Sequence, residues 1–305
     1  MPELPEVQTT VSGLSRVLPK QTIKDIWTDW PKMFHQSASP TLSSGATFLN
    51  FKKALVGAKI ISVSRRGKNI IFIFSNGKAF IVHMRMTGHL LYGKWQIENG
   101  KWRPVDKKSP LNDPFNRFAH VVLSLSSGNK IVFSDTRKFG RFDLENAKNI
   151  EHSPQLSHLG PEPLENNFTL KKFIARLATR PRGKIKPVLL DQRTVAGIGN
   201  IYSDEMLWRA GIHPESQVSK ISAPKINTLY LEMKRVLKSG ISFGGDSMSD
   251  YRNIFGEKGK FQEKHNAYRR TGKMCSKKEC SGIIKRKMIG GRSSHFCPTH
   301  QKLFK

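Results

Sequence analysis

The sequence has few cysteines, few acidic residues and no long apolar run. Only three cysteines occur among 305 residues, and all of them follow position 274. Their number and placement exclude a disulfide framework and favour an intracellular protein or a metal site. No run is apolar enough for a transmembrane helix, and the N-terminus lacks the basic and apolar regions of a secretory signal. We therefore expect a cytoplasmic protein without a membrane partner, associated with the nucleoid if the source is bacterial.

The shortage of acidic residues gives the chain a strong positive charge. It has 23 Asp and Glu against 52 Lys and Arg, a formal net charge of +29 and an isoelectric point near 10.3. A surface with this field attracts polyanions, so we expect DNA or RNA as the partner. Charge alone carries no chemistry, and a basic ribosome- or RNA-associated factor remains an alternative.

The second residue is the most informative one for chemistry. Aminopeptidases remove an initiator methionine before a small residue, so the mature chain is expected to start with the secondary amine of Pro2. An α-amino group titrates near pH ~8, against ~10.4 for lysine, so part of it is unprotonated at neutral pH. Attack of this amine on a sugar C1′ gives an iminium ion, which accepts electrons as later bonds break.

Two carboxylates follow within one helical turn of this amine. Glu3 and Glu6 are placed to protonate the sugar ring oxygen and to hold the amine or move its proton. A plainer interpretation is that Pro5 begins an amphipathic helix and that the acidic residues complement its dipole. Both interpretations can hold together.

Strand patterns dominate the first half of the chain. Residues 23–34 and 56–92 are rich in β-branched and aromatic residues, with a hairpin turn at 75–77, and a second hairpin spans residues 120–133. Residues 92–118 are polar and suggest a long surface loop or a short hairpin. We predict a β-sandwich or barrel domain over residues 1–150, capped by the first helix.

The second half changes to helical spacing after a proline-rich segment at residues 159–164. We predict a linker at 151–164, a helical DNA-binding domain at 165–256 and a basic module at 257–305. The predicted helices cover residues 168–177, 187–191, 201–210 and 221–237. The overall fold class is therefore α+β.

The basic module carries the spacing of a metal site. Cys275 and Cys280 are separated by sixteen residues from a second close pair, Cys297 and His300. Two pairs joined by a hairpin suit one tetrahedral zinc ion, and four protein ligands make it structural. His295 is an alternative ligand. The hairpin between the pairs would carry Arg292 near its tip, where it can enter a minor groove.

Other motifs are weak when taken singly. Asn200 begins a predicted helix after a glycine turn, and the N-terminus of such a helix can bind a phosphate. Lys68 follows a glycine at the end of a strand and can bind a phosphate, although a solvated turn lysine is the commoner case. Met86, Arg137 and Phe139 can fill the gap that an extruded base leaves in a duplex, although the two apolar residues are more often core.

Taken together, the motifs carry a family resemblance over nearly the whole chain. In order, residues 2–7, 65–68, 84–88, 134–140, 158–164, 197–202 and 290–297 resemble motifs of the formamidopyrimidine-DNA glycosylase (Fpg/Nei) family. The resemblance implies a bifunctional glycosylase and abasic-site lyase that removes oxidised bases such as 8-oxoguanine and formamidopyrimidines. It further implies β,δ-elimination, a monomer, and lesion-bearing double-stranded DNA in a basic cleft between the domains.

The resemblance also implies roles for single residues. Pro2 would be the Schiff-base nucleophile, Glu3 the proton donor, Glu6 its supporting carboxylate and Lys68 a phosphate-binding catalytic residue.

For DNA binding it implies a second set of residues. Met86, Arg137 and Phe139 would fill the void, with Arg137 facing the orphaned cytosine. Asn200 in a helix-two-turn-helix motif and Arg292 in the zinc finger would hold phosphates.

Three segments show where the chain follows the family pattern and where it departs from it. Residues 244–260 resemble a mobile loop that closes over an extruded purine, which favours the Fpg branch. His300 stands where the family has a fourth cysteine, and the first cysteine pair is more widely spaced than usual. Residues 92–118 are longer than in the shortest members and have no assigned role. A damaged-DNA binder without turnover is the rival from another class, although none of the four proposed catalytic residues is lost.

Overall fold

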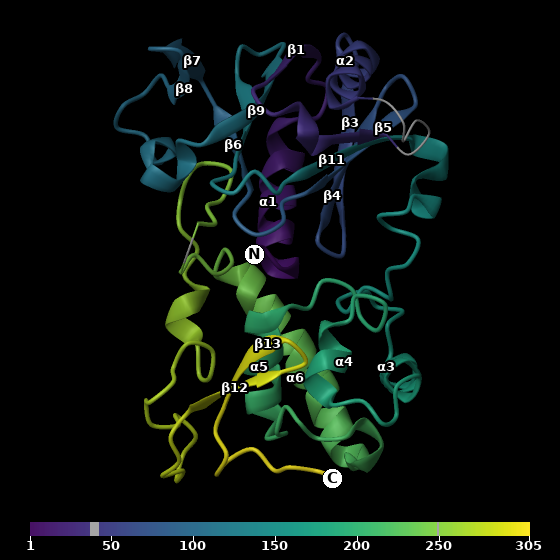
Figure 1. Ribbon diagram of the computed structural model, residues 1–305, viewed down its shortest axis with the longest axis vertical. Coiled ribbons are helices and arrows are strands. Elements are labelled where there is room, and N and C mark those ends of the chain that lie inside the picture. The colour runs from purple at the N-terminus through teal and green to yellow at the C-terminus, as the bar shows by residue number, and fades with distance from the viewer. Residues whose placement is uncertain (37–42, 249) are drawn as a thin grey trace. The chain divides into compact units, whose positions relative to one another are not determined.

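The computed structural model describes residues 1–36, 43–248 and 250–305. It divides into two compact units, the first formed by residues 1–157 and 243–260 and the second by residues 158–242 and 261–305 (Figure 1). Residues 243–256 of the predicted helical domain and residues 257–260 of the predicted basic module therefore fold with the first unit.

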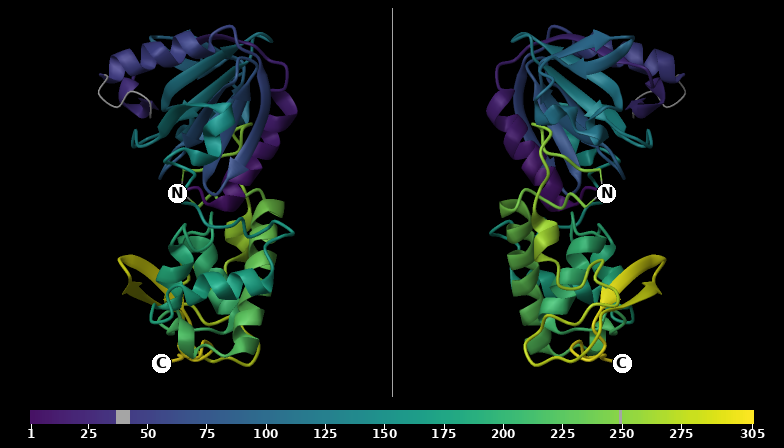
Figure 2. Two further views of the ribbon diagram at one scale, coloured as in Figure 1. Left: turned by 90° about the vertical axis from the view of Figure 1, so that its right-hand side faces the viewer. Right: turned by 90° about the vertical axis from the view of Figure 1, so that its left-hand side faces the viewer.

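The first unit is built on two sheets that face each other (Figure 2). One sheet has the order β1-β9-β10-β6 and the other the order β2-β11-β5-β4-β3. All neighbouring strands are antiparallel except β2 and β11. The strands are β1 (Ile23–Thr28), β2 (Phe34–Gln36), β3 (Ile60–Arg66), β4 (Asn69–Phe74), β5 (Lys78–His83), β6 (His89–Gly93), β9 (Ala119–Leu125), β10 (Lys130–Ser134) and β11 (Arg141–Asn146).

Aromatic side chains fill the space between the sheets. Phe72 and Phe80 stack with ring centroids 4.2 Å apart, and Phe133 meets Phe142 edge-on at 5.1 Å. All four are at most 1% exposed. Such rings bury a large apolar area and make a rigid base for the loops that leave the sandwich.

Two helices and a small hairpin complete the first unit. Helix α1 (Leu4–Val17) buries Val7, Val11 and Leu14 and packs along β3 and β4, and α2 (Ser44–Leu55) packs near β2. Between β6 and β9 the chain forms β7 (Trp95–Glu98) and β8 (Lys101–Pro104), followed by short 3₁₀ turns η2 (Pro110–Asn112) and η3 (Pro114–Asn116). Further 3₁₀ turns are η1 (Pro31–Met33) and η4 (Ala147–His152).

The second unit is helical and carries one hairpin. Its helices are α3 (Leu170–Ala178), α4 (Ile185–Leu190), α5 (Asn200–Ala210) and α6 (Ala223–Ser242), with 3₁₀ turns η5 (Val218–Lys220) and η6 (Phe261–Lys264). Helix α5 packs on α4, on α6 and on the hairpin strand β13. It ends at Gly211, whose positive φ of 67° suits a glycine after a helix. Strands β12 (Lys285–Ile289) and β13 (Arg292–Phe296) form the hairpin.

The predicted fold class, a β-sandwich with a capping helix and a helical domain with a β-hairpin, is confirmed. Helix α2 and strand β11 were not predicted. The polar residues Arg141, Glu145 and Asn146 obscure the strand pattern of apolar residues in β11. This strand is recognisable only from its pairing with β5.

Candidate active site and nucleic-acid interface

The N-terminal turn of α1 gathers the predicted nucleophile and both carboxylates. Pro2 is buried, and Glu3 and Glu6 are 2% and 1% exposed. The Glu3 backbone N–H donates to Oε2 of Glu6 at 2.8 Å, and the Asp246 N–H donates to Oε1 at 2.7 Å. A carboxylate that accepts N–H donors on both oxygens is stabilised in its ionised form and held in one orientation. The turn and the Asp246 N–H together hold the Glu6 carboxylate in one position near the chain terminus.

Lys68 lies in the two-residue turn between β3 and β4. Arg66 pairs with Asn69, and Gly67 takes a positive φ of 57°, which this turn requires. Arg65 bridges the turn to α1, because its Nε donates to Gln8 Oε1 at 2.9 Å and its Nη1 donates to the Gly67 carbonyl. Lys68 is only 7% exposed, so it is not a solvated turn lysine. The turn thus brings a cation to the first turns of α1.

The charge of Lys68 also acts on a half-buried histidine. Burial, reinforced by the charges of Arg85 and Lys68, lowers the pKa of His83 to about 3. His83 is therefore neutral at physiological pH. Its Nδ1 accepts the Arg85 N–H at 3.0 Å, so the ring proton is on Nε2.

One buried aspartate joins the two loops that carry the predicted void fillers. Asp135 is 0% exposed. Its Oδ1 accepts the Thr87 hydroxyl and the Arg137 N–H, the latter at 3.1 Å. Its Oδ2 accepts the Phe139 and Gly140 N–H groups, each at 2.8 Å. Sequence reasoning missed Asp135, because its partners are mainly backbone groups that no residue pattern reveals.

The side chains held by these loops are exposed. Met86 is 39% exposed and Phe139 is 51% exposed, which contradicts a role in the core. The Arg137 guanidinium lies 4.5 Å from the centroid of the Phe139 ring. A methionine, an aromatic ring and a stacked cation thus project from a rigid base, as insertion into a duplex requires.

In the second unit, the start of α5 meets the C-terminal hairpin. The Asn200 Nδ2 donates to Ser293 Oγ at 3.4 Å, which places the helix terminus beside the hairpin turn. Gly290 and Gly291 both have positive φ, 57° and 74°, as a two-residue hairpin turn demands. Arg292 follows them and is exposed. The structure therefore brings Asn200 and the Arg292 turn together.

A buried ionic cluster fixes this hairpin to the helices. Lys186 and Asp204 are 0% and 1% exposed, and their Nζ and Oδ1 atoms are 2.5 Å apart. Lys186 also donates to the Ser293 carbonyl at 2.8 Å, and Asp204 Oδ2 accepts the His295 backbone N–H at 3.0 Å. The His295 ring also lies 3.0 Å from Asp204, so His295 serves this cluster.

The three cysteines form a cluster at the base of the hairpin. Among the described residues, the sulfurs of Cys275, Cys280 and Cys297 lie within 4.8 Å of one another. The Cys280 and Cys297 sulfurs are 3.7 Å apart, near the ~3.8 Å that a tetrahedral ion with 2.3 Å bonds to sulfur requires. The Gly282 N–H lowers the pKa of the Cys280 thiol. Three close sulfur ligands fit a metal ion.

His300 lies beside this cluster without joining it. Its ring nitrogens do not belong to the group formed by the three cysteine sulfurs, and its Nε2 is 2.7 Å from the Trp208 carbonyl. A carbonyl only accepts, so Nε2 carries the proton and Nδ1 holds the lone pair.

In the described parts of the chain, no helix is both long and apolar enough to cross a bilayer.

Comparison with known proteins agrees with this geometry. The model of the formamidopyrimidine-DNA glycosylase N-terminal domain matches residues 1–142, and that of the H2TH domain matches residues 159–252. The formamidopyrimidine-DNA glycosylase of Desulfitobacterium hafniense is 41% identical over 301 residues, covering 99% of this chain and 100% of the relative. That of Bacillus subtilis is 36% identical over 297 residues, covering 97% and 98%.

Solved structures give the same result. The Lactococcus lactis Fpg in complex with abasic-site DNA superposes with a TM-score of 0.81 at 32% identity, covering 98% of this chain and 99% of that chain. A mutant of the same enzyme with DNA that contains Fapy-dG has a TM-score of 0.82 at 32% identity, with 99% and 100% coverage. The chain is thus a DNA glycosylase of base-excision repair, and it belongs to the formamidopyrimidine-DNA glycosylase family.

Proposed function

We propose that this protein excises oxidised bases, 8-oxoguanine and formamidopyrimidines, from double-stranded DNA and then cleaves the strand at the abasic site. The single observation that carries the proposal is the N-terminal turn, where Pro2 is buried beside the carboxylates of Glu3 and Glu6. The lesion-bearing DNA in complexes of the Lactococcus lactis relative supports the substrate class.

The chemistry begins with the Pro2 nitrogen. Removal of Met1 converts it from an amide to a secondary amine, which attacks C1′ as the bond to the base breaks and the base leaves with the electron pair. The amine proton passes, with Glu6 as its carrier, to the departing base. Glu3 then protonates the sugar ring oxygen, the bond from C1′ to that oxygen breaks, and a cationic iminium joins Pro2 to C1′. Loss of a C2′ proton then expels the 3′ phosphate, a second elimination expels the 5′ phosphate, and hydrolysis frees the amine.

Other residues position the DNA in this proposal. Lys68 binds a phosphate next to the lesion, since its turn is fastened to α1 by Arg65. Met86, Arg137 and Phe139 fill the space of the extruded nucleotide, with Arg137 facing the opposite base.

In the second unit, two residues take up the backbone of the DNA. Asn200 and Arg292 contact phosphates around the flipped nucleotide, which their shared position at the α5 terminus and the hairpin turn supports.

The metal in this proposal is one structural zinc ion. Cys275, Cys280 and Cys297 would supply sulfur. The ring of His300 lies outside this group and would have to bring Nδ1 toward it, and the hydrogen bond from Nε2 to the Trp208 carbonyl leaves the lone pair on Nδ1. A ring nitrogen whose partner N–H is held by a carbonyl is the usual arrangement of a histidine ligand. Zinc would stabilise the fold and take no part in the reaction.

The nucleophile is tested by reductive trapping. The full-length protein is incubated with an 8-oxoguanine duplex and borohydride, and the adduct is mapped by mass spectrometry. We expect a covalent adduct at Pro2 and loss of Met1 from the expressed protein.

An N-terminal extension that is not processed, which turns the amine into an amide, should abolish the adduct, whereas the same extension at the C-terminus should not. An adduct on an internal lysine, or an undiminished adduct with the N-terminal extension, would contradict the proposal. The absence of any adduct with the wild type would favour the binder without turnover.

A further inference from the structure

Residues 93–118, which we call the insertion, contact residues 243–260, and this second segment in turn contacts Glu6. Both segments belong to the first unit, and position 249 lies outside the described residues. The Tyr92 N–H, at the end of β6, donates to the Ile254 carbonyl at 2.6 Å. Gly256 lies so close to the insertion that a Cβ there would be 2.6 Å from Pro110. The two segments are therefore packed backbone against backbone.

The second contact between them is an ion pair of a buried arginine with a half-buried aspartate. Arg252 is 1% exposed, and its Nε lies 2.9 Å from Oδ2 of Asp113 in the insertion. Its guanidinium also lies 4.9 Å from the centroid of the Phe115 ring. Burial acts to raise the pKa of the Asp113 carboxyl, but Arg252, the Phe115 N–H and the charge of Lys258 together outweigh it and hold the pKa below its ordinary value. The carboxylate is therefore charged opposite Arg252.

The insertion is itself held rigidly behind Asp113. Asn116 is 0% exposed, and its side chain donates to the Pro110 carbonyl at 3.1 Å and contacts Nε2 of His89 at 2.8 Å. Asp113 Oδ1 accepts the Phe115 N–H at 3.0 Å, which fixes the carboxylate at the start of η3. The Asp113 side chain thus has little freedom to follow Arg252 if the segment shifts.

The contacts continue from Arg252 to Glu6. Arg252 Nη1 donates to the Tyr251 carbonyl at 2.8 Å, and Ser247 Oγ donates to the same carbonyl at 2.8 Å. The Tyr251 hydroxyl donates to the Glu6 carbonyl at 2.9 Å. The neighbouring Asp246 N–H donates to the Glu6 carboxylate. The position of this N–H donor therefore depends on where Arg252 holds the segment.

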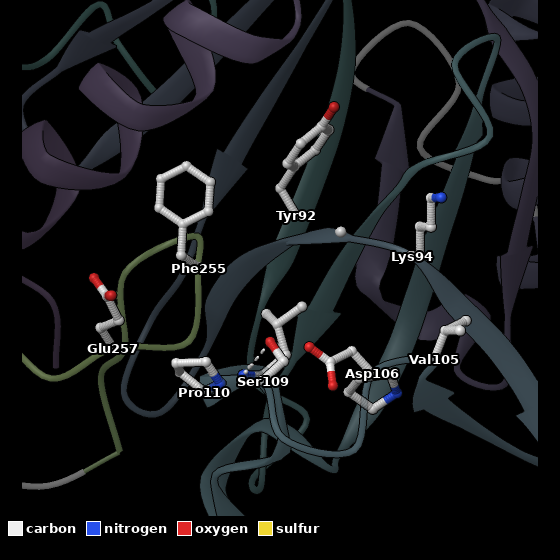
Figure 3. A pocket seen from close by; sticks show the side chains of 11 residues that line it. Tyr92, Lys94, Val105, Asp106, Ser109, Pro110, Phe255 and Glu257 are labelled. Atoms are coloured by element: carbon white, nitrogen blue, oxygen red, sulfur yellow. Dashed lines mark hydrogen bonds between the residues drawn. The ribbon is translucent and has the colours of Figure 1, made fainter.

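The apolar contacts beside the ion pair are incomplete. A cavity of about 410 Å³ separates part of the insertion from the segment, with Phe255 and Glu257 on one side and Ser109 and Pro110 on the other (Figure 3). Phe255 is 47% exposed. The ion pair and the close contact of Gly256 with Pro110 are therefore the specific attachments beside this cavity.

We propose that Asp113 and Arg252 are a positioning pair, through which the insertion holds residues 243–260 so that the Asp246 N–H orients the Glu6 carboxylate. This inference rests on the proposed role of Glu6 in catalysis. It gives the insertion, which has no assigned chemistry, a function in the reaction of the first unit. Neither residue of the pair touches substrate in this proposal.

Rate constants separate positioning from stability. Asp113→Asn, Arg252→Met and the double variant are compared with the wild type in single-turnover excision from an 8-oxoguanine duplex. Loss of folded protein lowers only the amplitude of the reaction, whereas a misplaced carboxylate lowers the rate constant. We expect each variant to react about tenfold more slowly, within the ~100-fold that a 1 Å misplacement can cost. The double variant should be no slower than either single variant, because the pair is lost in all three.

Two further variants act as controls. Arg252→Lys keeps the charge and should be faster than Arg252→Met. Asp25→Asn removes the same kind of carboxylate from an ion pair with Lys52 in the same unit, without contact to residues 243–260, and should keep the wild-type rate constant.

Amide hydrogen exchange tests the attachment without DNA or turnover. We expect Asp113→Asn to speed exchange at Asp246 and Tyr251 and to leave the β-sandwich core protected. Unchanged exchange, or wild-type rate constants in Asp113→Asn with normal trapping, would overturn the positioning pair and leave the proposed nucleophile intact. Absence of trapping in the wild type would refute the proposed function, while faster exchange would still establish the attachment.

Discussion

Replacement of Asp135 tests how one carboxylate supports two loops. In Asp135→Asn one oxygen becomes an NH₂ group that cannot accept. The favoured orientation turns the NH₂ toward Thr87, since a hydroxyl can rotate to accept, and keeps the oxygen on Phe139 and Gly140. Only the Arg137 N–H then loses its acceptor, which costs about 1 kcal/mol, the low end of the range for a buried donor, because this N–H is only partly buried. Asp135→Ala strands three N–H groups and should cost about 3 kcal/mol or more.

Urea unfolding followed by tryptophan emission measures these losses. Four of the five tryptophans, Trp27, Trp30, Trp95 and Trp102, lie in the first unit, so the emission reports its unfolding. The exposed Asp106→Asn is the matched control and should stay within about 0.5 kcal/mol of wild type. The reasoning fails if Asp135→Ala unfolds within about 1 kcal/mol of wild type, or if Asp135→Asn costs more than Asp135→Ala.

Three other predictions concern the second unit. Lys186→Met leaves the buried Asp204 carboxylate without its ion partner and should lower the free energy of unfolding by about 3–5 kcal/mol in urea titrations, whereas a loss near zero would contradict the pairing. Hydrogen bonds from two lysines lower the pKa of Glu215 to about 2, so its contribution to stability is complete above about pH 4.5 and disappears as the pH falls toward 2. Glu215→Gln should weaken the pH dependence of the urea midpoint between these pH values. Added salt should have the same effect on the wild type, because the two lysines are half exposed. Cys280→Ser should reduce bound zinc measured by elemental analysis, and unchanged zinc would exclude this ligand.

The sequence predicted those parts of the fold that repeat a local pattern. The hairpin of β4 and β5 was predicted because runs of β-branched and aromatic residues flank the turn at Ser75, Asn76 and Gly77. The predicted loop or short hairpin over residues 92–118 contains the hairpin of β7 and β8. Its attachment to Arg252 depends on residues more than a hundred positions away, which no local pattern encodes.

The candidate site shows the same division. Glu3 and Glu6 were found because they lie one turn apart in the sequence, and the three cysteines because their spacing is that of a metal site. Asp135 was missed, since a single aspartate in a loop carries no signal until its backbone partners are known. The burial of Lys68 likewise follows from the bridge that Arg65 makes to α1.

The buried contact between Lys186 and Asp204 has a consequence for damage to the protein itself. This ionic cluster fastens the hairpin of β12 and β13 near its tip, and the proposed zinc ion would fasten its base through the cysteines. Oxidation of a thiol would release the base of the hairpin but leave the end that carries Arg292 attached to α5. A repair enzyme exposed to oxidants that damage DNA would in this way lose the proposed zinc ion and keep the proposed phosphate contact of Arg292.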